Sequence, residues 1–352
     1  MRKMNLKSLI TTITESLGWH QQRCVTFSSL VSGIINQSNV QHHALSLGFH
    51  NNVGSLKSKL ERIRRFFAGQ TIDYEAFAKS MLMTIFKEIP KMHIIIDRTN
   101  WKFGKKDINY LVLAARIGEV TFPLFWNLLE HQGCSDAPKR IELMEQFRRT
   151  FGFDKVLSLT ADREFIGADW LNYLCQHNVP FFIRIKDNRL VPWGSQNPKP
   201  LKDFFSHLSL GQERPLYTTI NENNLLVVGK RIKDEMLVVC SNVKNPKKIL
   251  KTYKKRWCIE TCFKNMKTQG FNLENTHMTL LPRLKKLMAV VAVAILISCL
   301  SGVTQKCPYK KTVLAPLYSI LTRGLRLLKH HLWEIDIGSI LQTSIPFLSS
   351  EG

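Results

Sequence analysis

The chain has 352 residues and is strongly basic, with 50 lysines and arginines against 27 aspartates and glutamates and a formal net charge of +23. Its hydrophobic content of 44% is too high for a disordered basic tail and predicts a folded protein with a substantial core. The charge favours a polyanionic partner such as nucleic acid. The eight cysteines form no C-x-x-C pair and no pattern of a secreted disulfide framework, which indicates a reduced, cytosolic protein.

Residues 1–90 are predicted to be helical throughout, with helices over 27–35, 38–47 and 53–67 separated by breaks at Gly48 and Asn51-Asn52. The third helix carries a basic face, which consists of Lys57, Lys59, Arg62, Arg64 and Arg65. A helix, a turn and a second helix with a basic face are typical of helix-turn-helix DNA docking, although any small helical bundle contains such a pair. DNA contact and plain helix packing are both open for this region.

Strand-like runs begin after residue 90. Three of them predict an antiparallel meander, with a hairpin at Gly118-Glu119: 93–97, 110–117 and 120–129. Helices and buried strands are then expected to alternate: a helix over 137–150, a strand over 156–162, a helix over 170–177 and a strand over 180–185. The order β-β-β-α-β-α-β indicates an α/β fold.

Two of these predicted strands, the first and the fourth, end in an acid, and the acids are Asp97 and Asp162. Ligand sites in open α/β sheets lie beyond the carboxyl ends of strands, so we expect the two carboxylates to meet at one edge of the sheet. Taken singly, each aspartate could equally cap a turn or a helix.

The segments that follow interrupt this alternation. Residues 187–243 carry prolines and short strand-like runs and are predicted to form an inserted β-rich subdomain. The apolar run 287–300 is shorter than the roughly 18–20 residues that span a bilayer, which predicts a buried core helix within 279–300 and no membrane association. Residues 313–332 predict an amphipathic basic helix with Arg323, Arg326 and Lys329.

A single carboxylate, Glu260, lies in a basic stretch from Lys244 to Lys267 that is predicted to be helical. At about 100° per residue, five residues share one face of this helix: Tyr253, Arg256, Glu260, Lys264 and Lys267. One anion among cations suits a site where phosphates and a divalent metal meet. The alternative is an ordinary basic helix with an i,i+4 ion pair from Glu260 to Lys264 or Arg256, which is worth about 0.2–0.5 kcal/mol.

A second face of the same helix is apolar, with Ile259, Phe263 and Met266, and is expected to pack on a core. Cys258 and Cys262 could nominally hold a soft metal with His277, but a helix already committed to phosphates disfavours zinc.

Tyr253, Arg256, Glu260 and Lys267 spell Tyr-(2)-Arg-(3)-Glu-(6)-Lys, and with them the chain resembles the bacterial insertion-sequence transposases of the DDE (Asp-Asp-Glu) group. The segments Asp97-Arg98-Thr99-Asn100-Trp101 and Asp162-Arg163-Glu164-Phe165 are similar to the first two acidic motifs of that group. The resemblance covers about residues 90–300. It implies a ribonuclease-H-like mixed sheet with a β-rich insertion between the second aspartate and the glutamate.

The resemblance also implies the chemistry. Asp97, Asp162 and Glu260 are the expected catalytic residues and the ligands of two divalent ions, usually Mg²⁺, with Mn²⁺ able to substitute. Glu164 is not preferred, because Asp162 directly follows the buried strand. The expected contacts to DNA phosphates come from Tyr253, Arg256, Lys264 and Lys267.

The function implied is cleavage at transposon ends and strand transfer into target DNA, by a homodimer bound to terminal inverted repeats and target DNA in the bacterial cytoplasm. A catalytically silent DNA-binding copy and a nuclease of the same fold without strand transfer are the alternatives. Some relatives stack a flipped base on an aromatic ring, for which Trp193 and Trp257 are candidates, although Trp257 is expected to pack in the core.

Five regions follow from this interpretation. They are a helical DNA-binding domain (1–90), the first part of a ribonuclease-H-like core (91–186), a β-rich insertion (187–243), the catalytic and core helices (244–302) and a C-terminal helical segment (303–352).

Overall fold

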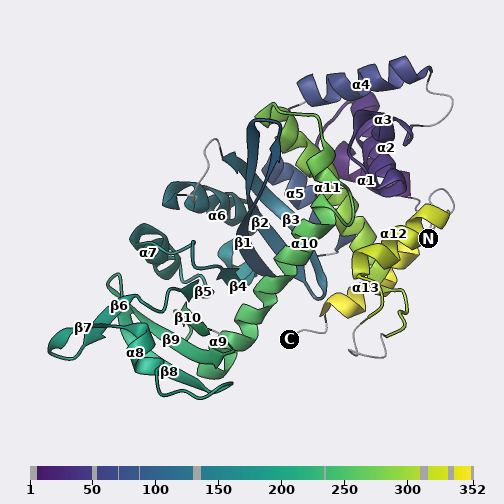
Figure 1. The fold of residues 1–352 in the computed structure, drawn as a ribbon. Helices are drawn as coiled ribbons and strands as arrows, with labels where there is room; N and C mark the ends of the chain where they lie inside the picture. The colour runs from purple at the N-terminus through teal and green to yellow at the C-terminus, as the bar shows by residue number, and fades with distance from the viewer. Residues whose placement is uncertain are drawn as a thin grey trace.

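A computed structural model describes residues 6–49, 54–69, 71–86, 88–129, 136–233, 235–309, 316–331 and 337–349. Its N-terminal part is helical, as predicted, and Figure 1 shows these helices grouped at one end of the molecule. They are α1 (Leu6–Glu15), α2 (Gln21–Gln37), α3 (His42–Ser46), α4 (Leu56–Gly69) and α5 (Tyr74–Ile85). The helix predicted over 38–47 is shorter than expected, because Ser38 adopts a left-handed conformation and its N–H caps α2.

An eight-stranded mixed sheet forms the centre of the molecule, in the order β3-β2-β1-β4-β5-β10-β9-β8. Its strands are β1 (Met92–Phe103), β2 (Lys106–Ile117), β3 (Val120–Leu129), β4 (Val156–Ala161), β5 (Phe181–Ile185), β8 (Glu213–Ile220), β9 (Asn223–Ile232) and β10 (Glu235–Ser241). β1, β2 and β3 form the predicted antiparallel meander, and β4 lies parallel to β1. The prediction of an α/β fold of the ribonuclease-H type with a mixed sheet is confirmed.

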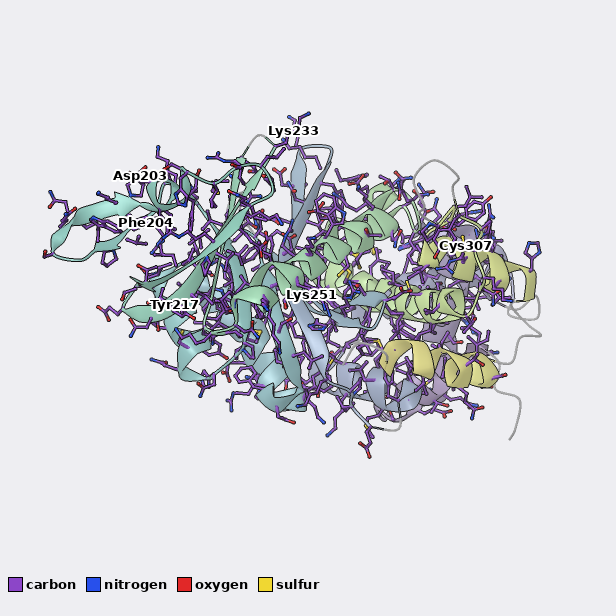
Figure 2. The ribbon with its side chains drawn as sticks, turned by 90° about the horizontal axis from the view of Figure 1, so that it is seen from below. Asp203, Phe204, Tyr217, Lys233, Lys251 and Cys307 are labelled. Carbon is purple, nitrogen blue, oxygen red and sulfur yellow. The ribbon has the colours of Figure 1, made fainter. Side chains whose placement is uncertain are left out.

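The segment between β5 and α9 (Pro246–Tyr253) is rich in strands. β6 (Leu190–Trp193) and β7 (Gln196–Pro200) pair only with each other, next to α8 (Leu201–Phe205). β8, β9 and β10 instead extend the central sheet, because β10 pairs antiparallel with β5. Seen from below, the molecule is elongated, with Phe204 of this segment near one end and Cys307 near the other (Figure 2).

The remaining helices lie against the sheet, except the last two, which pack on α11 (Leu281–Val303). They are α6 (Ala137–Phe151), α7 (Ala168–Gln176), α10 (Trp257–Lys267), α11 (Leu281–Val303), α12 (Ile320–His331) and α13 (Ile337–Ser349), with short 3₁₀ turns at Phe153–Lys155, Lys254–Arg256 and Leu273–Asn275. The predicted helix over 313–332 begins at Ile320 as observed, and its residues 313–315 lie outside the described part of the chain.

Helix α11 is hydrophobic, and helices from both ends of the chain pack on it. It packs against β3, α2, α4, α12 and α13, and every residue from Leu287 to Val303 is buried. Among the described residues it is the one helix long and apolar enough to cross a membrane, but almost all of that stretch is covered by protein. The predicted core helix is confirmed, although it is longer than the apolar run alone indicated.

Lys286 of α11 forms a hydrogen bond to the N-terminal helix α4. Its side chain is only 9% exposed, and its ammonium donates to the carbonyl of Phe67 at 2.8 Å, in the last turn of α4. The last carbonyls of a helix lack partners within that helix and carry partial negative charge, so a lysine is a favourable partner there. The N-terminal helices and the sheet therefore share one continuous core.

Candidate active site

Asp97 lies on β1, between its antiparallel neighbour β2 and its parallel neighbour β4. The prediction that the strand ends at Asp97 is wrong, because β1 continues to Phe103 and pairs with β2 over its whole length. The Asp97 carboxylate is 16% exposed, and burial raises its pKa to about 6 although Arg256 and the Arg98 N–H favour the charged form. Such a carboxylate gains from a cation held against it.

Asp162 follows directly after β4, as predicted. Ile96 pairs with Ala161 in the parallel ladder, so Asp97 and Asp162 are the next residues on neighbouring strands, which lie about 4.8 Å apart. Their carboxylates are close enough that the Asp162 charge contributes to the raised pKa of Asp97. The Oδ1 atom of Asp162 is buried and has no hydrogen-bond partner among the described residues.

Glu260 lies in the first turn of α10 and reaches Asp97 through Arg256. Arg256 Nη2 donates to Glu260 Oε1 at 2.6 Å, and Arg256 Nη1 donates to Asp97 Oδ2 at 3.1 Å. The guanidinium is only 12% exposed, so it serves both carboxylates as a largely buried counter-cation. The i,i+4 pair from Glu260 to Arg256 is thus present, and it is part of a larger cluster that spans the sheet and the helix.

The other residues predicted to share the helix face lie in different surroundings. Lys267 donates to the Asn100 carbonyl of β1 at 2.7 Å and pairs with Glu274. Lys264 is exposed. Tyr253 belongs to α9 and is buried in a small cluster beneath β5, β9 and β10, which raises its pKa to about 12. The apolar face packs as predicted, with Ile259, Phe263 and Met266 all buried.

Whether these carboxylates fit a divalent metal can be judged from their oxygen atoms. Among the described residues, no three histidine, cysteine, aspartate or glutamate side chains lie close enough together to hold an ion. The Arg256 guanidinium lies between Asp97 and Glu260, and its positive charge compensates the negative charges of both carboxylates. Carboxylate oxygens are the donors that Mg²⁺ prefers, and the unpartnered Oδ1 of Asp162 is one of them, so the donor chemistry suits such an ion although the three side chains stand apart in this structure.

An ion pair between the two acidic motifs escaped the sequence-based interpretation. Arg98 and Glu164 form a bidentate pair, with distances of 2.8 Å from Nε to Oε1 and 2.6 Å from Nη2 to Oε2. The Glu164 backbone carbonyl also accepts from the buried Arg140 at 3.1 Å. Glu164 is therefore engaged in holding the Asp162 turn against β1.

A second contact joins the turn before α10 to β1. Lys255 Nζ lies 2.8 Å from His93 Nε2, and His93 Nδ1 lies 2.7 Å from the Ser158 hydroxyl of β4. The imidazole thus connects two strands and the turn that precedes α10.

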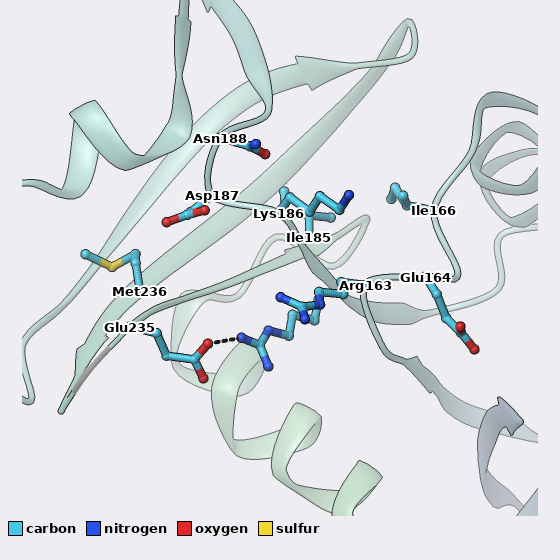
Figure 3. A pocket seen from close by; sticks show the side chains of 10 residues that line it. Arg163, Glu164, Ile166, Ile185, Lys186, Asp187, Asn188, Glu235 and Met236 are labelled. Atoms are coloured by element: carbon cyan, nitrogen blue, oxygen red, sulfur yellow. Dashed lines mark hydrogen bonds and ion pairs between the residues drawn. The ribbon is translucent and has the colours of Figure 1, made fainter. Parts of the chain in front are cut away.

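A cavity of about 750 Å³ opens beside Asp162, at the ends of β4, β5 and β10. Its wall includes Arg163, Lys186 and Asp187, together with Arg184, which is paired with Glu235. The side chains of Arg163 and Glu164 point in opposite directions, so that the two neighbours serve different surroundings (Figure 3). The volume of this cavity lies within the range of about 300–1,000 Å³ that is common for ligand pockets.

One of the two tryptophans differs from expectation. Trp257 was predicted to pack in the core, but its side chain is 63% exposed. It is the first residue of α10, while the buried side of that helix begins at Ile259. Trp193 lies on β6, contacts Phe204 edge-on and has the Lys199 ammonium 4.9 Å above its ring. Neither ring lies among the carboxylates.

Comparison with known protein families identifies a match. No curated protein matches the chain. The model of the transposase DDE domain matches residues 88–297, which is more than half of the chain and includes Asp97, Asp162 and Glu260. The matched span begins just before β1 and ends inside α11, so it contains the whole central sheet and both helices of the basic stretch. The chain therefore belongs to the DDE transposase family.

Proposed function

We propose that this transposase cuts DNA at the ends of its element and joins those ends to target DNA, with Asp97, Asp162 and Glu260 as its catalytic residues. The observation that carries the proposal is the convergence of Asp97 and Glu260 on one guanidinium beside Asp162, from segments far apart in the chain. DDE transposases use divalent metal ions. We infer two ions here, Mg²⁺ or in its place Mn²⁺, which when bound would activate the attacking hydroxyl and stabilise the leaving oxygen.

The chain's own residues would prepare that site. Asp97 and Asp162 would hold the ions from the sheet, and Glu260 from the first turn of α10, where the helix dipole favours its negative charge. Arg256 would leave its two carboxylates when the ions bind, and its guanidinium would then be available to a phosphate near the scissile bond.

DNA positioning is assigned to the remaining residues of the Tyr-(2)-Arg-(3)-Glu-(6)-Lys spacing. Lys264 is exposed and can reach a phosphate directly. Lys267 would exchange its contacts with Asn100 and Glu274 for DNA. The Tyr253 hydroxyl would donate to a phosphate oxygen only after some opening of its cluster, because the residue is largely buried.

The five regions are proposed with these roles: DNA binding by residues 1–90, catalysis by 91–186 and 244–302, and supporting roles for 187–243 and 303–352. Helix α4 gives the first of them its basis, because Lys57, Arg62, Arg64 and Arg65 are exposed along it. Two element ends must be held together for recombination, so we propose a homodimer in the DNA complex. The protein would act in the cytoplasm, on the nucleoid.

The test is Glu260→Gln, which removes the charge and keeps the shape of the side chain. Incubated with Mg²⁺ and a duplex carrying the terminal repeat, the wild-type protein should give nicked ends and joined products. The variant should give neither and should bind the same duplex with unchanged affinity. Glu119→Gln, in the exposed turn between β2 and β3, is the matched control and should cut normally.

Each outcome separates the candidates. Full cleavage by Glu260→Gln would remove this residue from the mechanism. Cleavage without joined products in the wild-type protein would favour a nuclease of the same fold. DNA binding without any cleavage, in Mg²⁺ and in Mn²⁺, would favour a silent DNA-binding copy.

A further inference from the structure

A second basic pocket lies away from the carboxylates, where the N-terminal helices meet the segment between α10 and α11. Its volume is about 500 Å³. One wall comes from α3 and α4, with His42, His43 and Arg64, and the other comes from residues 276–283, with His277 and Arg283. None of the described residues that line it is acidic, so the pocket presents only cationic and neutral groups to a ligand.

The arginines of this pocket have little to neutralise them. Arg283 is half-buried and forms no ion pair or side-chain hydrogen bond within the described residues. In that same part of the chain, the ion-pair partner of Arg64 is Glu61, at a distance of 3.9 Å, and the Arg64 side chain is 65% exposed. Because a half-buried guanidinium without a carboxylate is costly, an anion that enters between Arg64 and Arg283 would be held by both.

His42 supplies an independent observation. Its ring stacks on Phe67 at 5.7 Å, and its Nε2 atom is buried without a hydrogen-bond partner among the described residues. Burial lowers the pKa of His42, and the nearby charges of Arg64 and Arg283 lower it further. A buried imidazole nitrogen without a protein partner can donate to an oxygen of an anion that enters this pocket.

The N-terminus of α11 also favours an anion in this pocket. The helix begins at Leu281 with no side chain that caps its N-terminus and no acidic residue in its first turn. Thr279, Leu280 and Arg283 line the pocket, so the positive end of a 23-residue helix faces the same space.

The geometry relates the pocket to the catalytic residues through β1. The ring of Phe103, at the end of β1, lies 5.5 Å from the ring of His277 in the pocket wall. The strand from Asp97 to Phe103 covers about 20 Å at ~3.3 Å per residue. That distance corresponds to about six base-pair steps of B-DNA at ~3.4 Å each.

We propose that this pocket binds one backbone phosphate of the element-end duplex, about six base pairs from the phosphodiester that is cut. This inference rests on the proposed function, because it takes the duplex to lie across Asp97. The phosphate would be shared between Arg64 of α4 and Arg283 of α11, which ties the N-terminal helices and the catalytic core to the same DNA end.

The experiment uses the full chain and a duplex with methylphosphonate, which carries no charge, at one position at a time between four and eight base pairs from the cut. In the wild-type protein, one such position should weaken binding by about tenfold, as expected for loss of a charge-assisted contact. In Arg283→Gln the same substitution should have no further effect. Arg283→Lys should restore the sensitivity in part.

The salt dependence of DNA binding gives a second measurement, which does not require knowing which phosphate the pocket contacts. Arg283→Gln and Arg64→Gln should each lower the slope of log affinity against log salt by about one, and the double variant by about one in total, because both hold the same phosphate. Arg214→Gln, on exposed β8, makes the same charge change and should leave the slope as it is. Arg64 is largely exposed, so its variant should fold even if Arg283→Gln does not.

A free phosphate ion could be the ligand instead, and thermal unfolding distinguishes the two. A rise of the melting temperature in inorganic phosphate over chloride at equal ionic strength, lost in Arg283→Gln without any change in DNA binding, would overturn the DNA assignment. Another outcome is that the wild-type protein cuts the duplex while Arg283→Gln abolishes the effect of methylphosphonate on binding at no position. In that case the pocket inference fails and the proposed function stands. A wild-type protein that binds no duplex would remove both.

Discussion

Arg256 donates to the carboxylate of Asp97, 159 residues earlier in the chain, at 3.1 Å. The same guanidinium is bound to Glu260, so it competes with any metal ion for both oxygens. We predict that Arg256→Gln tightens Mn²⁺ binding by about tenfold or more, since charged hydrogen bonds contribute about 1.5–3 kcal/mol each. Cleavage should fall in the same variant, because a phosphate contact is lost. Calorimetric titration with Mn²⁺ measures the first effect and a cleavage assay the second.

Arg163→Gln is the control for the loss of one positive charge near the carboxylates, because Arg163 lies in the wall of the adjoining cavity without touching Asp97. Its Mn²⁺ affinity should change by less than that of Arg256→Gln. Equal tightening in both variants would show a general effect of charge and not competition for the two carboxylates.

The raised pKa of Asp97 predicts how stability depends on pH in the absence of divalent ions. Burial raises this pKa from 3.8 to about 6, so the folded protein binds the proton more tightly than the unfolded chain. The ionised carboxylate therefore destabilises the fold above about pH 6, and this cost disappears as the pH falls below 4. Asp97→Asn should be more stable than the wild-type protein by about 1–3 kcal/mol at pH 7.5, and no more stable near pH 3.5.

Urea unfolding in EDTA across this pH range measures the difference between the two proteins. Asp203→Asn, at an exposed position of α8, should show no such dependence on pH. A difference between Asp97→Asn and wild type that is constant from pH 3.5 to 7.5 would contradict the prediction.

The ion pair between Arg98 and Glu164 predicts a positioning role. Glu164→Gln should destabilise the protein by about 1–3 kcal/mol, between the values for exposed and buried pairs. It should also slow cleavage by about tenfold to a hundredfold, because the Asp162 turn would no longer be held in register with Asp97. Glu145→Gln, which breaks an ion pair on the surface of α6, is the control and should leave cleavage unchanged.

A double-mutant cycle with Arg98→Met and Glu164→Met tests whether the two residues act together. If the pair acts as a unit, the double variant should cut about as slowly as either single variant. Independent, multiplying losses would instead mean that each residue has its own partner in catalysis.

The contact from Lys286 to the Phe67 carbonyl predicts where the protein opens first when the contact is removed. Lys286→Met keeps the apolar stem and removes the ammonium, which should lower the protection of α4 amides from hydrogen exchange by about 1–3 kcal/mol. The amides of β1 should be unaffected. Lys285→Met is the matched neighbour, because Lys285 donates to Asn127 on β3 instead of to α4. Equal loss of α4 protection in both variants would rule out a specific cap.

The sequence predicted most of the fold because its patterns are local. Each strand of the meander, the strand before Asp162 and the buried side of α10 can be recognised within about a dozen residues. The extent of β1 was missed although a signal was present: Thr99 and Trp101 are buried and Asn100 and Lys102 are exposed, which is the alternation of a strand.

The rest of the site depends on pairing between distant segments, for which no spacing rule exists. Arg98 and Glu164 are separated by 66 residues, and the sequence around each of them does not indicate its partner. The exposure of Trp257 depends on where α10 begins after the 3₁₀ turn, which a uniform helical wheel from Lys244 to Lys267 cannot locate. Pockets that draw walls from two regions, such as the one with Arg64 and Arg283, are likewise visible only once both regions are in place.

Helix α11 has a consequence for the order in which the protein matures. The helices of residues 6–85 bury their apolar side chains in the same core as α11, which leaves the ribosome some 200 residues later. A nascent chain that has released only its first helices lacks the surface they pack on and the lysine that closes α4. Under the roles proposed here, DNA recognition would be complete only when Asp97, Asp162 and Glu260 have all been synthesised, so truncated products would be poor competitors for the element ends.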